Sequence, residues 1–231
     1  MIRGLTKNNI KVTALTRNIH QKGYILKTQA NPGYLEVVEG KISDHELIKK
    51  LFSNADLCVN LIGILFEKGK NNFNNIHVEF PKMISRYAST YKLEKFVHLS
   101  ALGIENAKDS IYAQSKLKGE EEILNNFDKA VIARPSIVYS VDDNFTTQLM
   151  TLLGLLPIFP IYYNGKTKFR PIFCSDLTNS ITKIITDDIK ENIIEFAGPE
   201  EMSFKEILEK LLSLIEKKRL LLPMPISLAR M

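Results

Sequence analysis

Ser100, Tyr112 and Lys116 are three side chains that could act together in proton transfer. Tyr112 and Lys116 stand four residues apart at the start of a helical pattern, so both project from one helix face. An ammonium beside a phenol favours the phenolate and lowers the tyrosine pKa, which would make Tyr112 a proton donor or acceptor near neutral pH. Ser100 ends an apolar run typical of a buried parallel strand, and its hydroxyl could hold a substrate oxygen. A Tyr-x-x-x-Lys spacing alone also fits an ordinary solvated helix face.

Alternating strand and helix patterns surround these three residues. Short apolar runs predict strands at 10–15, 35–38, 57–62, 96–99 and 130–133. Helical patterns are predicted at 44–51, 76–91 and 112–125. This alternation indicates an α/β fold with a Rossmann-like, doubly wound parallel sheet.

The pattern changes after residue 140. A helix is expected at 145–156, extended segments at 157–163 and 169–173, a helix capped by Asp176 at 177–185, and a strand at 193–196. Ser203 and Glu206 have the spacing of a capping box before a further amphipathic helix. We therefore expect a domain at 1–140 and a smaller α+β region of the substrate-binding type at 141–231.

Composition and charge narrow the function classes. The 231 residues carry a formal net charge of +5, with one tight basic cluster at 217–219 and no nucleic-acid-binding module. Contact with an acidic partner or an anionic membrane surface stays open. Cys58 and Cys174 lie in apolar runs without metal-ligand spacing, which is typical of core residues in a reducing compartment. The longest apolar run, 149–163, is interrupted by prolines and too short to span a bilayer, so we expect a soluble or peripheral protein.

Four motifs resemble the short-chain dehydrogenase/reductase superfamily in its extended and atypical branch. They are the segment 60–63, the strand ending in Ser100, Tyr112-x-x-x-Lys116, and the segment 134–139. More narrowly, the chain resembles the nucleotide-binding accessory subunits of respiratory complex I and their bacterial relatives. The segments 59–65, 80–84, 94–103 and 220–225 carry that resemblance, which covers essentially the whole chain.

The chain departs from this family at its beginning. Family members begin with a strand and a Gly-x-x-Gly-x-x-Gly turn, which lays the cofactor pyrophosphate on a helix N-terminus. Here Gly4 is a lone glycine, and residues 1–9 read as the tail of a helix. The absent strand would be the central one of the sheet, so its two neighbours should be left unpaired. We expect the sequence to be incomplete at both ends.

The resemblance implies a cofactor preference. Arg17, just past the first predicted strand, matches the place where NADP-preferring relatives hold the adenosine 2′-phosphate, so NADP(H) is expected over NAD(H). A solvated arginine is the alternative. Lys41 stands where relatives commonly place an Asp near the adenine.

The resemblance also assigns residues around the nicotinamide. Gly63 and Ile64 match the loop that passes over the cofactor, and Asn60 either contacts the cofactor or has a structural role. His77 stands where many extended members use an Asn, and packing is the favoured interpretation of this histidine. Three residues match the segment lining the nicotinamide side: Pro135, Ile137 and Val138.

Three functions remain. The first is an NAD(P)H-binding accessory or assembly subunit of NADH:quinone oxidoreductase, with complex I subunits as partners and a mainly structural NADPH. It would be cytoplasmic or on the matrix side, held at the inner membrane only through its partners. The second is a free-standing NADP-dependent reductase or epimerase, in which Ser100 orients the carbonyl, Tyr112 protonates it and Lys116 holds the ribose. The third is a sensor or assembly factor whose nucleotide only stabilises the fold.

Overall fold

The chain forms two compact units. The computed structural model describes residues 1–141, 143–187 and 189–225. The first unit contains residues 1–134 and 178–195, and the second contains 135–177 and the chain from residue 196 onward. Residues 178–195 thus belong to the first unit, although they follow a segment of the second unit. The expected division into 1–140 and 141–231 does not include this return of the chain.

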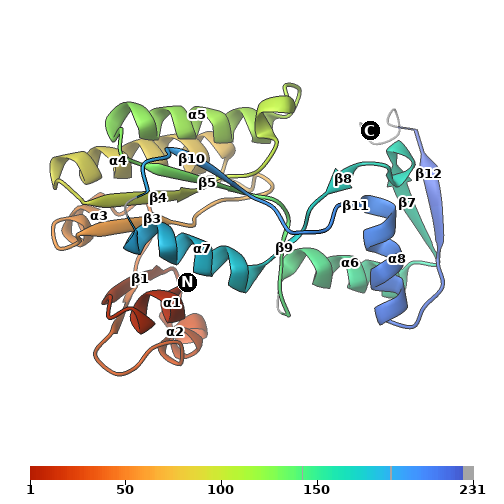
Figure 1. Ribbon diagram of the computed structural model, residues 1–231, viewed down its shortest axis with the longest axis horizontal. Helices are drawn as coiled ribbons and strands as arrows, with labels where there is room; N and C mark the ends of the chain where they lie inside the picture. Colours follow the sequence, from red (N-terminus) through yellow and green to blue (C-terminus); the bar gives the residue numbers. More distant parts are fainter. Residues whose placement is uncertain (142, 188, 226–231) are drawn as a thin grey trace. The chain divides into compact units, whose positions relative to one another are not determined.

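A four-stranded sheet of order β10-β5-β4-β3 forms the centre of the first unit (Figure 1). Its strands are β3 (Leu57–Asn60), β4 (Lys95–Leu99), β5 (Val131–Pro135) and β10 (Ile193–Phe196). β3 runs parallel to β4, with Cys58 opposite Phe96, and β4 runs parallel to β5, with Val97 opposite Val131. The predicted parallel α/β architecture is confirmed.

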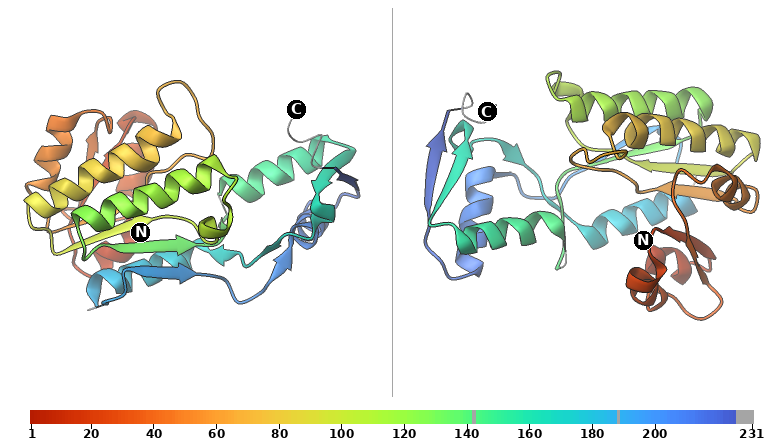
Figure 2. Two further views of the ribbon diagram at one scale, coloured as in Figure 1. Left: turned by 90° about the horizontal axis from the view of Figure 1, so that it is seen from above. Right: turned by 180° about the vertical axis from the view of Figure 1, so that it is seen from behind.

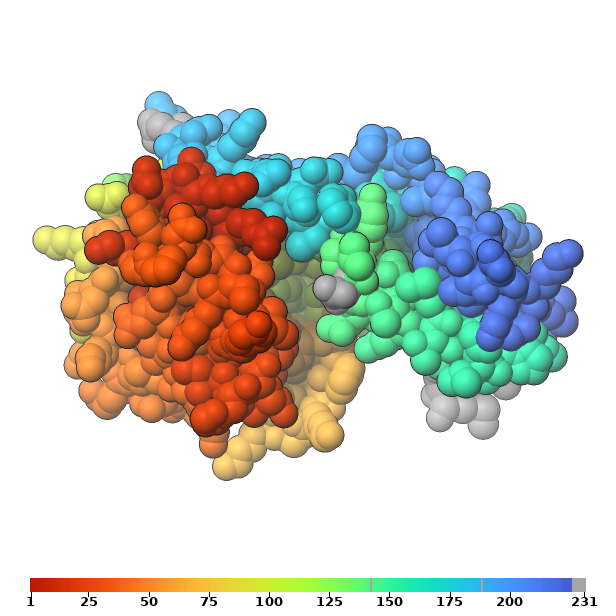
Figure 3. All heavy atoms as spheres, turned by 90° about the horizontal axis from the view of Figure 1, so that it is seen from below, coloured from red at the N-terminus to blue at the C-terminus, as the bar shows by residue number. Residues whose placement is uncertain are grey.

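The two strands at the beginning of the chain form a separate sheet. β1 (Val12–Thr16) and β2 (Leu35–Glu39) are parallel, with Val12 opposite Leu35. Within the described residues β1 is paired only with β2, and β3 only with β4, so each has one unpaired edge. The expectation that these two strands are left unpaired on one side is therefore confirmed, and the backbone groups along both edges lack a ladder partner in the described residues. Together with α1 (Ile2–Lys7), α2 (Ile19–Lys27) and α3 (His45–Phe52), these strands occupy one face of the first unit (Figure 3).

Helices cover both faces of the four-stranded sheet. α4 (Phe80–Thr90) and α5 (Ile111–Asn126) lie side by side over one face (Figure 2), and α7 (Cys174–Thr186), from Thr178 on, lies against the other. The core beneath α4 and α5 is apolar and closely packed. It contains Ile48, Phe52, Phe80, Ile84, Ala88, Leu93, Phe96, Ile123, Phe127, Ala130 and Ile132. Packing of this apolar layer fixes where α5, the helix of Tyr112 and Lys116, sits on the sheet.

Helices α2 and α7 differ from the sequence prediction. α2 was not predicted, because its apolar residues do not gather on one face and Gly23 lies inside it; Asn18 caps its N-terminus by accepting from Gln21 N–H. Asp44 caps α3 by accepting from the N–H of Leu47. Asp176 lies within the first turn of α7, which begins at Cys174, so its predicted role as the N-cap is wrong.

The second unit is built around two helices and a pair of strands. Its larger elements are α6 (Asn144–Leu155), β7 (Ile158–Tyr162), α8 (Phe204–Leu214) and β12 (Leu220–Met224). Short strands complete it: β6 (Val138–Tyr139), β8 (Lys168–Phe169), β9 (Ile172–Phe173) and β11 (Met202–Ser203). The capping box of Ser203 and Glu206 is confirmed. β12 pairs with β7 in parallel, with Leu220 opposite Ile158, and this strand was not predicted.

The basic cluster at 217–219 caps a helix. Lys217 Nζ donates to the carbonyl of Gly154 at 2.9 Å, and Arg219 Nε donates to the carbonyl of Leu153 at 2.9 Å. Both carbonyls belong to the last turn of α6, where orphan acceptors and the helix dipole favour cations. Two of the three charges therefore have an internal role. In the described part of the chain, no helix is long and apolar enough to cross a bilayer.

Candidate functional site

A pocket of about 180 Å³ lies at the carboxyl ends of β3 and β4. The loop after β3, the end of β4 and the first turns of α5 line it: Leu61, Ile62, Gly63, Ile64, Leu65, Leu99, Ser100, Tyr112 and Lys116. Ligands of open α/β sheets bind at this edge. The structure therefore brings the three predicted catalytic residues, together with Gly63 and Ile64, into one pocket.

Ser100 follows β4 directly and is buried. Its backbone N–H donates to the carbonyl of Ala133 at 2.7 Å, which continues the β4–β5 pairing by one residue. Its Oγ is buried and has no hydrogen-bond partner within the described residues. Buried hydroxyl groups normally have a hydrogen-bond partner, so the Ser100 hydroxyl can donate to or accept from a polar group that binds in the pocket.

Tyr112 lies in the first turn of α5. Ser110 caps the helix by accepting from Ala113 N–H, so the register of Tyr112 and Lys116 is set at the helix start. Burial raises the pKa of the Tyr112 phenol above its usual value of 10.0. The expectation that Lys116 lowers this pKa is therefore wrong for the protein alone: desolvation of the phenolate dominates. At neutral pH Tyr112 is a neutral phenol, which can donate a proton.

Lys116 is buried and bridges α5 to β4. Its Nζ donates to the carbonyl of Leu99 at 2.8 Å. Burial lowers the pKa of Lys116 to about 8, and the nearby carboxylate of Glu120 opposes that shift. Lys116 is thus a cation at neutral pH, held at the floor of the pocket, with donor capacity beyond its bond to Leu99.

The helix before α4 is a π-helix, η1 (Asn74–Glu79), where a regular helix was predicted from residue 76. Pro81 has no N–H, so it cannot donate to the carbonyl of His77 four residues earlier, which disfavours a continuous α-helix here. Gly119 of α5 packs directly on that carbonyl: a Cβ at Gly119 would lie 1.8 Å from His77 O. The irregular helix and the glycine together let α5 approach η1 closely.

The loop over the pocket is held by buried polar side chains. His77 accepts a hydrogen bond from the N–H of Ile64 at 3.1 Å through Nε2. Asn60 Oδ1 accepts from the N–H of Ile62 at 3.1 Å, and Asn60 Nδ2 lies 2.9 Å from His98 Nδ1. Asn60 therefore shapes the loop from behind instead of lining the pocket. A Cβ at Gly63 would lie 3.8 Å from His77 Nε2 and from Lys116 Nζ, an ordinary van der Waals distance, so the loop at Gly63 lies close to both side chains.

An ion pair joins the site helix to β5. Arg134 binds Glu120 with two hydrogen bonds, Nε to Oε1 at 3.1 Å and Nη2 to Oε2 at 2.6 Å. The Glu120 side chain is 4% exposed and the Arg134 side chain 12%. The pair was not predicted, because its partners lie fourteen residues apart on different elements; the signal available was a glutamate on the apolar side of the α5 pattern.

The sequence of the chain is similar to those of known proteins. The chain is 24% identical over 202 residues to the mitochondrial NADH dehydrogenase (ubiquinone) 1 alpha subcomplex subunit 9 of Mus musculus, covering 87% of this chain and 54% of that protein. It is 25% identical over 213 residues to the subunit of the same name from Dictyostelium discoideum, covering 92% and 59%. The chain is therefore similar in sequence to this subunit over most of its own length. It spans between 54% and 59% of the length of these two relatives. No protein-family model matches it.

Solved structures share the fold of this chain. A Bacillus cereus UDP-glucuronic acid 4-epimerase, in complex with UDP-glucuronic acid and NAD, has a TM-score of 0.76 at 19% identity, covering 97% of this chain and 81% of the epimerase. A Bacillus anthracis dTDP-4-dehydrorhamnose reductase, in complex with NADP, has a TM-score of 0.73 at 16% identity, covering 95% and 86%. The predicted resemblance to the extended short-chain dehydrogenases is confirmed at the level of the fold.

Four other predicted site residues of the chain do not line the pocket. Arg17 follows β1 and is exposed to solvent. Pro135, Ile137 and Val138 belong to the second unit, where the carbonyl of Ile137 accepts from the N–H of Ile172. Their expected contacts with a cofactor stay predictions.

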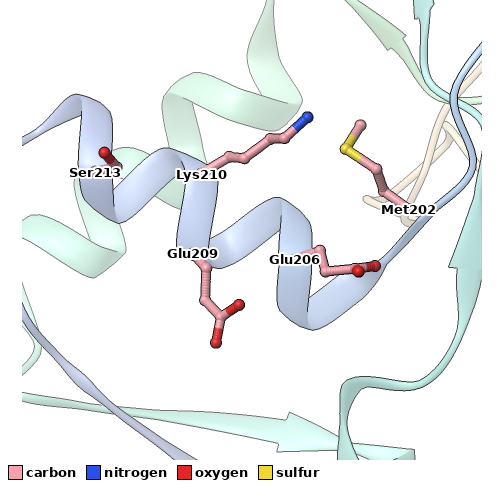
Figure 4. A pocket seen from close by; sticks show the side chains of 5 residues that line it. All are labelled: Met202, Glu206, Glu209, Lys210 and Ser213. Atoms are coloured by element: carbon pink, nitrogen blue, oxygen red, sulfur yellow. The ribbon is translucent and has the colours of Figure 1, made fainter.

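A second hollow, on the surface of α8, lacks the features of a chemical site. It is lined by Met202, Glu206, Glu209, Lys210 and Ser213 (Figure 4). Glu206 is engaged in the capping box, and Lys210 pairs with Glu200 at 3.2 Å. Glu209 and Lys210 leave the helix in different directions (Figure 4), so no group of side chains converges there. The smaller pocket at the sheet edge is the candidate site.

Proposed function

We propose that the chain is an NAD(P)H-binding accessory or assembly subunit of NADH:quinone oxidoreductase, in which the nucleotide mainly stabilises the fold. The observation that carries this proposal is the similarity to a NADH dehydrogenase subunit over 87% of the chain. Because the chain spans little more than half of that relative, its partners are also part of the proposal. They are the neighbouring subunits of complex I.

The pocket supports the nucleotide part of the proposal. Its volume of about 180 Å³ is below the roughly 300 Å³ of the smallest drug-sized sites, so it suits one ring-sized portion of a larger ligand. The unpaired Oγ of Ser100 and the ammonium of Lys116 would bind the polar groups of the nicotinamide riboside. Arg17 would bind a 2′-phosphate and so favour NADP(H), because its guanidinium is exposed and matches phosphate geometry.

Membrane association would come from partners. We infer a peripheral position at the inner membrane, on the cytoplasmic side or its matrix equivalent. The mitochondrial relatives support this inference, and so does the finding that no helix in the described residues is suited to cross a bilayer.

The test is nucleotide content and assembly state in the native host. The protein is purified gently through a tag at its natural locus, and the undenatured sample is sized. A portion is then denatured and the released NADP(H) and NAD(H) are assayed. We expect about one NADPH per chain in a large, membrane-associated assembly. A free protein without bound nucleotide would contradict the proposal.

A second candidate, a reductase or epimerase, is supported by the catalytic constellation itself. Tyr112 is a neutral phenol beside a buried ammonium and an unpaired serine hydroxyl, all in one pocket. A substrate carbonyl there would accept from Ser100 and take its proton from Tyr112, while Lys116 stabilises the phenolate that results. A bound reduced nicotinamide supplies hydride, which no side chain can provide.

Replacement of one oxygen separates the two candidates. Tyr112→Phe removes the proton donor and keeps the ring packed against Phe73, 5.8 Å away between centroids. In a reductase this variant loses turnover and keeps nucleotide binding. In an accessory subunit it assembles normally with its nucleotide. Tyr87→Phe, on α4 and outside the pocket, is the matched control.

A further inference from the structure

His77 occupies an unusual position beside the candidate site. It lies in the π-helix η1, is 1% exposed, and faces both α5 and the loop over the pocket. Both of its ring nitrogens are bonded. Nε2 accepts from the N–H of Ile64 at 3.1 Å, and Nδ1 lies 2.9 Å from Ser115 Oγ. A histidine that only fills space would not need partners on two different elements.

These bonds determine the position of the ring proton. The N–H of Ile64 can only donate, so Nε2 must be unprotonated. The Ser115 hydroxyl donates its single proton to the carbonyl of Tyr112 at 2.7 Å, so it must accept from His77 Nδ1. All three bonds are satisfied by one species, the neutral imidazole protonated on Nδ1.

The charged groups around His77 keep it neutral. Burial and the Lys116 ammonium lower the pKa of His77 to about 4. His98, on the adjacent strand, is also neutral, since burial and Lys116 lower its pKa well below the usual value. Tyr112 is a neutral phenol, as described above. The hydrogen-bonded species is therefore the one present at neutral pH.

Aromatic contacts extend the arrangement to Tyr112. The His77 ring stacks on Phe73 with centroids 5.3 Å apart and meets the Tyr112 ring edge-on at 5.4 Å. Tyr112 is thus held by its ring, while Ser115, one turn along the same helix, is held by hydrogen bonds. A shift of His77 would therefore displace both the loop at Ile64 and the ring of Tyr112.

We propose that His77 is a positioning residue that clamps the pocket loop at Ile64 to helix α5 at Ser115, and thereby sets the pocket width and the orientation of Tyr112. The effect of this clamp on nucleotide affinity rests on the proposed function. The clamp itself does not rest on that function, because its hydrogen bonds form in the protein without a ligand. An experiment can therefore refute the clamp without refuting nucleotide binding, and the reverse.

The first test is the protonation state of each ring nitrogen in the unaltered protein. Nitrogen-15 NMR of histidine-labelled protein distinguishes a protonated from an unprotonated ring nitrogen. We expect His77 to show a protonated Nδ1 and an unprotonated Nε2, unchanged between pH 8 and pH 5. A protonated Nε2, or a ring that becomes a cation in this range, would overturn the proposal. No variant is needed, so folding defects cannot obscure the result.

The second test uses two variants with opposite hydrogen-bonding capacity. His77→Phe keeps an aromatic ring and removes both bonds, whereas His77→Gln restores an acceptor for Ile64 and a donor for Ser115. We expect hydrogen exchange of the Ile64 amide to accelerate roughly 5- to 150-fold in H77F and to recover in H77Q. The amide of Val97, inside β4, reports the stability of the first unit, and its exchange rate corrects for any change in that stability. Equal exchange of Ile64 in H77F and the unaltered protein, after that correction, would refute the clamp.

NADPH titration of the same variants separates the clamp from the function. Weaker binding in H77F with recovery in H77Q supports both. Unchanged binding, with the expected tautomer and amide protection, supports the clamp and counts against nucleotide binding in this pocket.

Discussion

Gly119 is a position where one added methyl group should disturb the packing around the site severely. A Cβ there would lie 1.8 Å from the carbonyl oxygen of His77 and 3.0 Å from its carbon. Unstrained contacts are about 3.5 Å, so α5 and η1 would have to move apart by more than about 1.5 Å. No rotamer change can relieve the contact, because both of the opposing atoms are backbone.

We expect Gly119→Ala to destabilise the protein, which is the opposite of what helix propensity alone predicts for a Gly→Ala change. In an unconstrained helix, Gly→Ala stabilises by up to about 1 kcal/mol. At Gly119 the forced separation should exceed that gain, since overpacking a core costs about 1–3 kcal/mol even where side chains can adjust. We expect Gly119→Ala to lower the free energy of unfolding of the first unit by about 2–4 kcal/mol. Gly154→Ala in α6 is the control: its Cβ would meet only Lys217 Nζ, at 3.8 Å, and should be neutral or slightly stabilising.

The assay is urea unfolding followed by hydrogen exchange of peptides from each unit, because two compact units need not unfold together. Peptides of β4 report the first unit, and peptides of α8 report the second. Nucleotide affinity provides a second readout, since Lys116 lies one turn before Gly119. A G119A protein as stable as the unaltered one would refute the close approach of α5 to η1 on which the geometry of the site depends.

Three further predictions follow from charges. Glu120→Gln leaves Arg134 with only the more distant carboxylates of Glu105 and Glu195. We expect this change to lower the free energy of unfolding of the first unit by about 2–3 kcal/mol in the same unfolding assay. An unchanged midpoint would show that the Arg134–Glu120 pair makes no net contribution to stability. The pKa of Lys116 is about 8 in the folded protein against 10.5 in the unfolded chain, so the side chain loses its charge as the pH rises through 8. NADPH affinity should therefore fall above pH 8, while the free energy of unfolding rises toward pH 10.5, because the unfolded chain binds the additional proton in this range. An NADPH affinity that rises together with stability would contradict the role of the Lys116 ammonium in nucleotide binding. Arg17→Ala should weaken NADPH more than NADH in fluorescence titrations, and equal effects would refute the phosphate contact; Arg86→Ala, an exposed arginine of α4, is the control.

Local patterns were sufficient to predict the scaffold of the site. Buried parallel strands have apolar sequences, so β3, β4 and β5 were predicted within about two residues, and α5 was predicted from its helical pattern. Ser100, Tyr112 and Lys116 meet because a strand end and the start of the next helix share one edge of a parallel sheet, which is a consequence of chain order. That much of the site was determined by the sequence alone.

The tertiary structure decided the chemical state of those residues. Lys116 is a weakened base because it is buried, and Tyr112 is a neutral phenol because it is partly buried; a spacing of four residues carries no information on burial. The partners of His77 and Glu120 lie on elements that only packing brings together, and the parallel pairing of β12 with β7 is a long-range contact that its prolines conceal. Sequence periodicity reports which face of an element is apolar. Which polar groups meet, and with what protonation, depends on the free energy of desolvation in the folded core, and this exists only once the elements have packed.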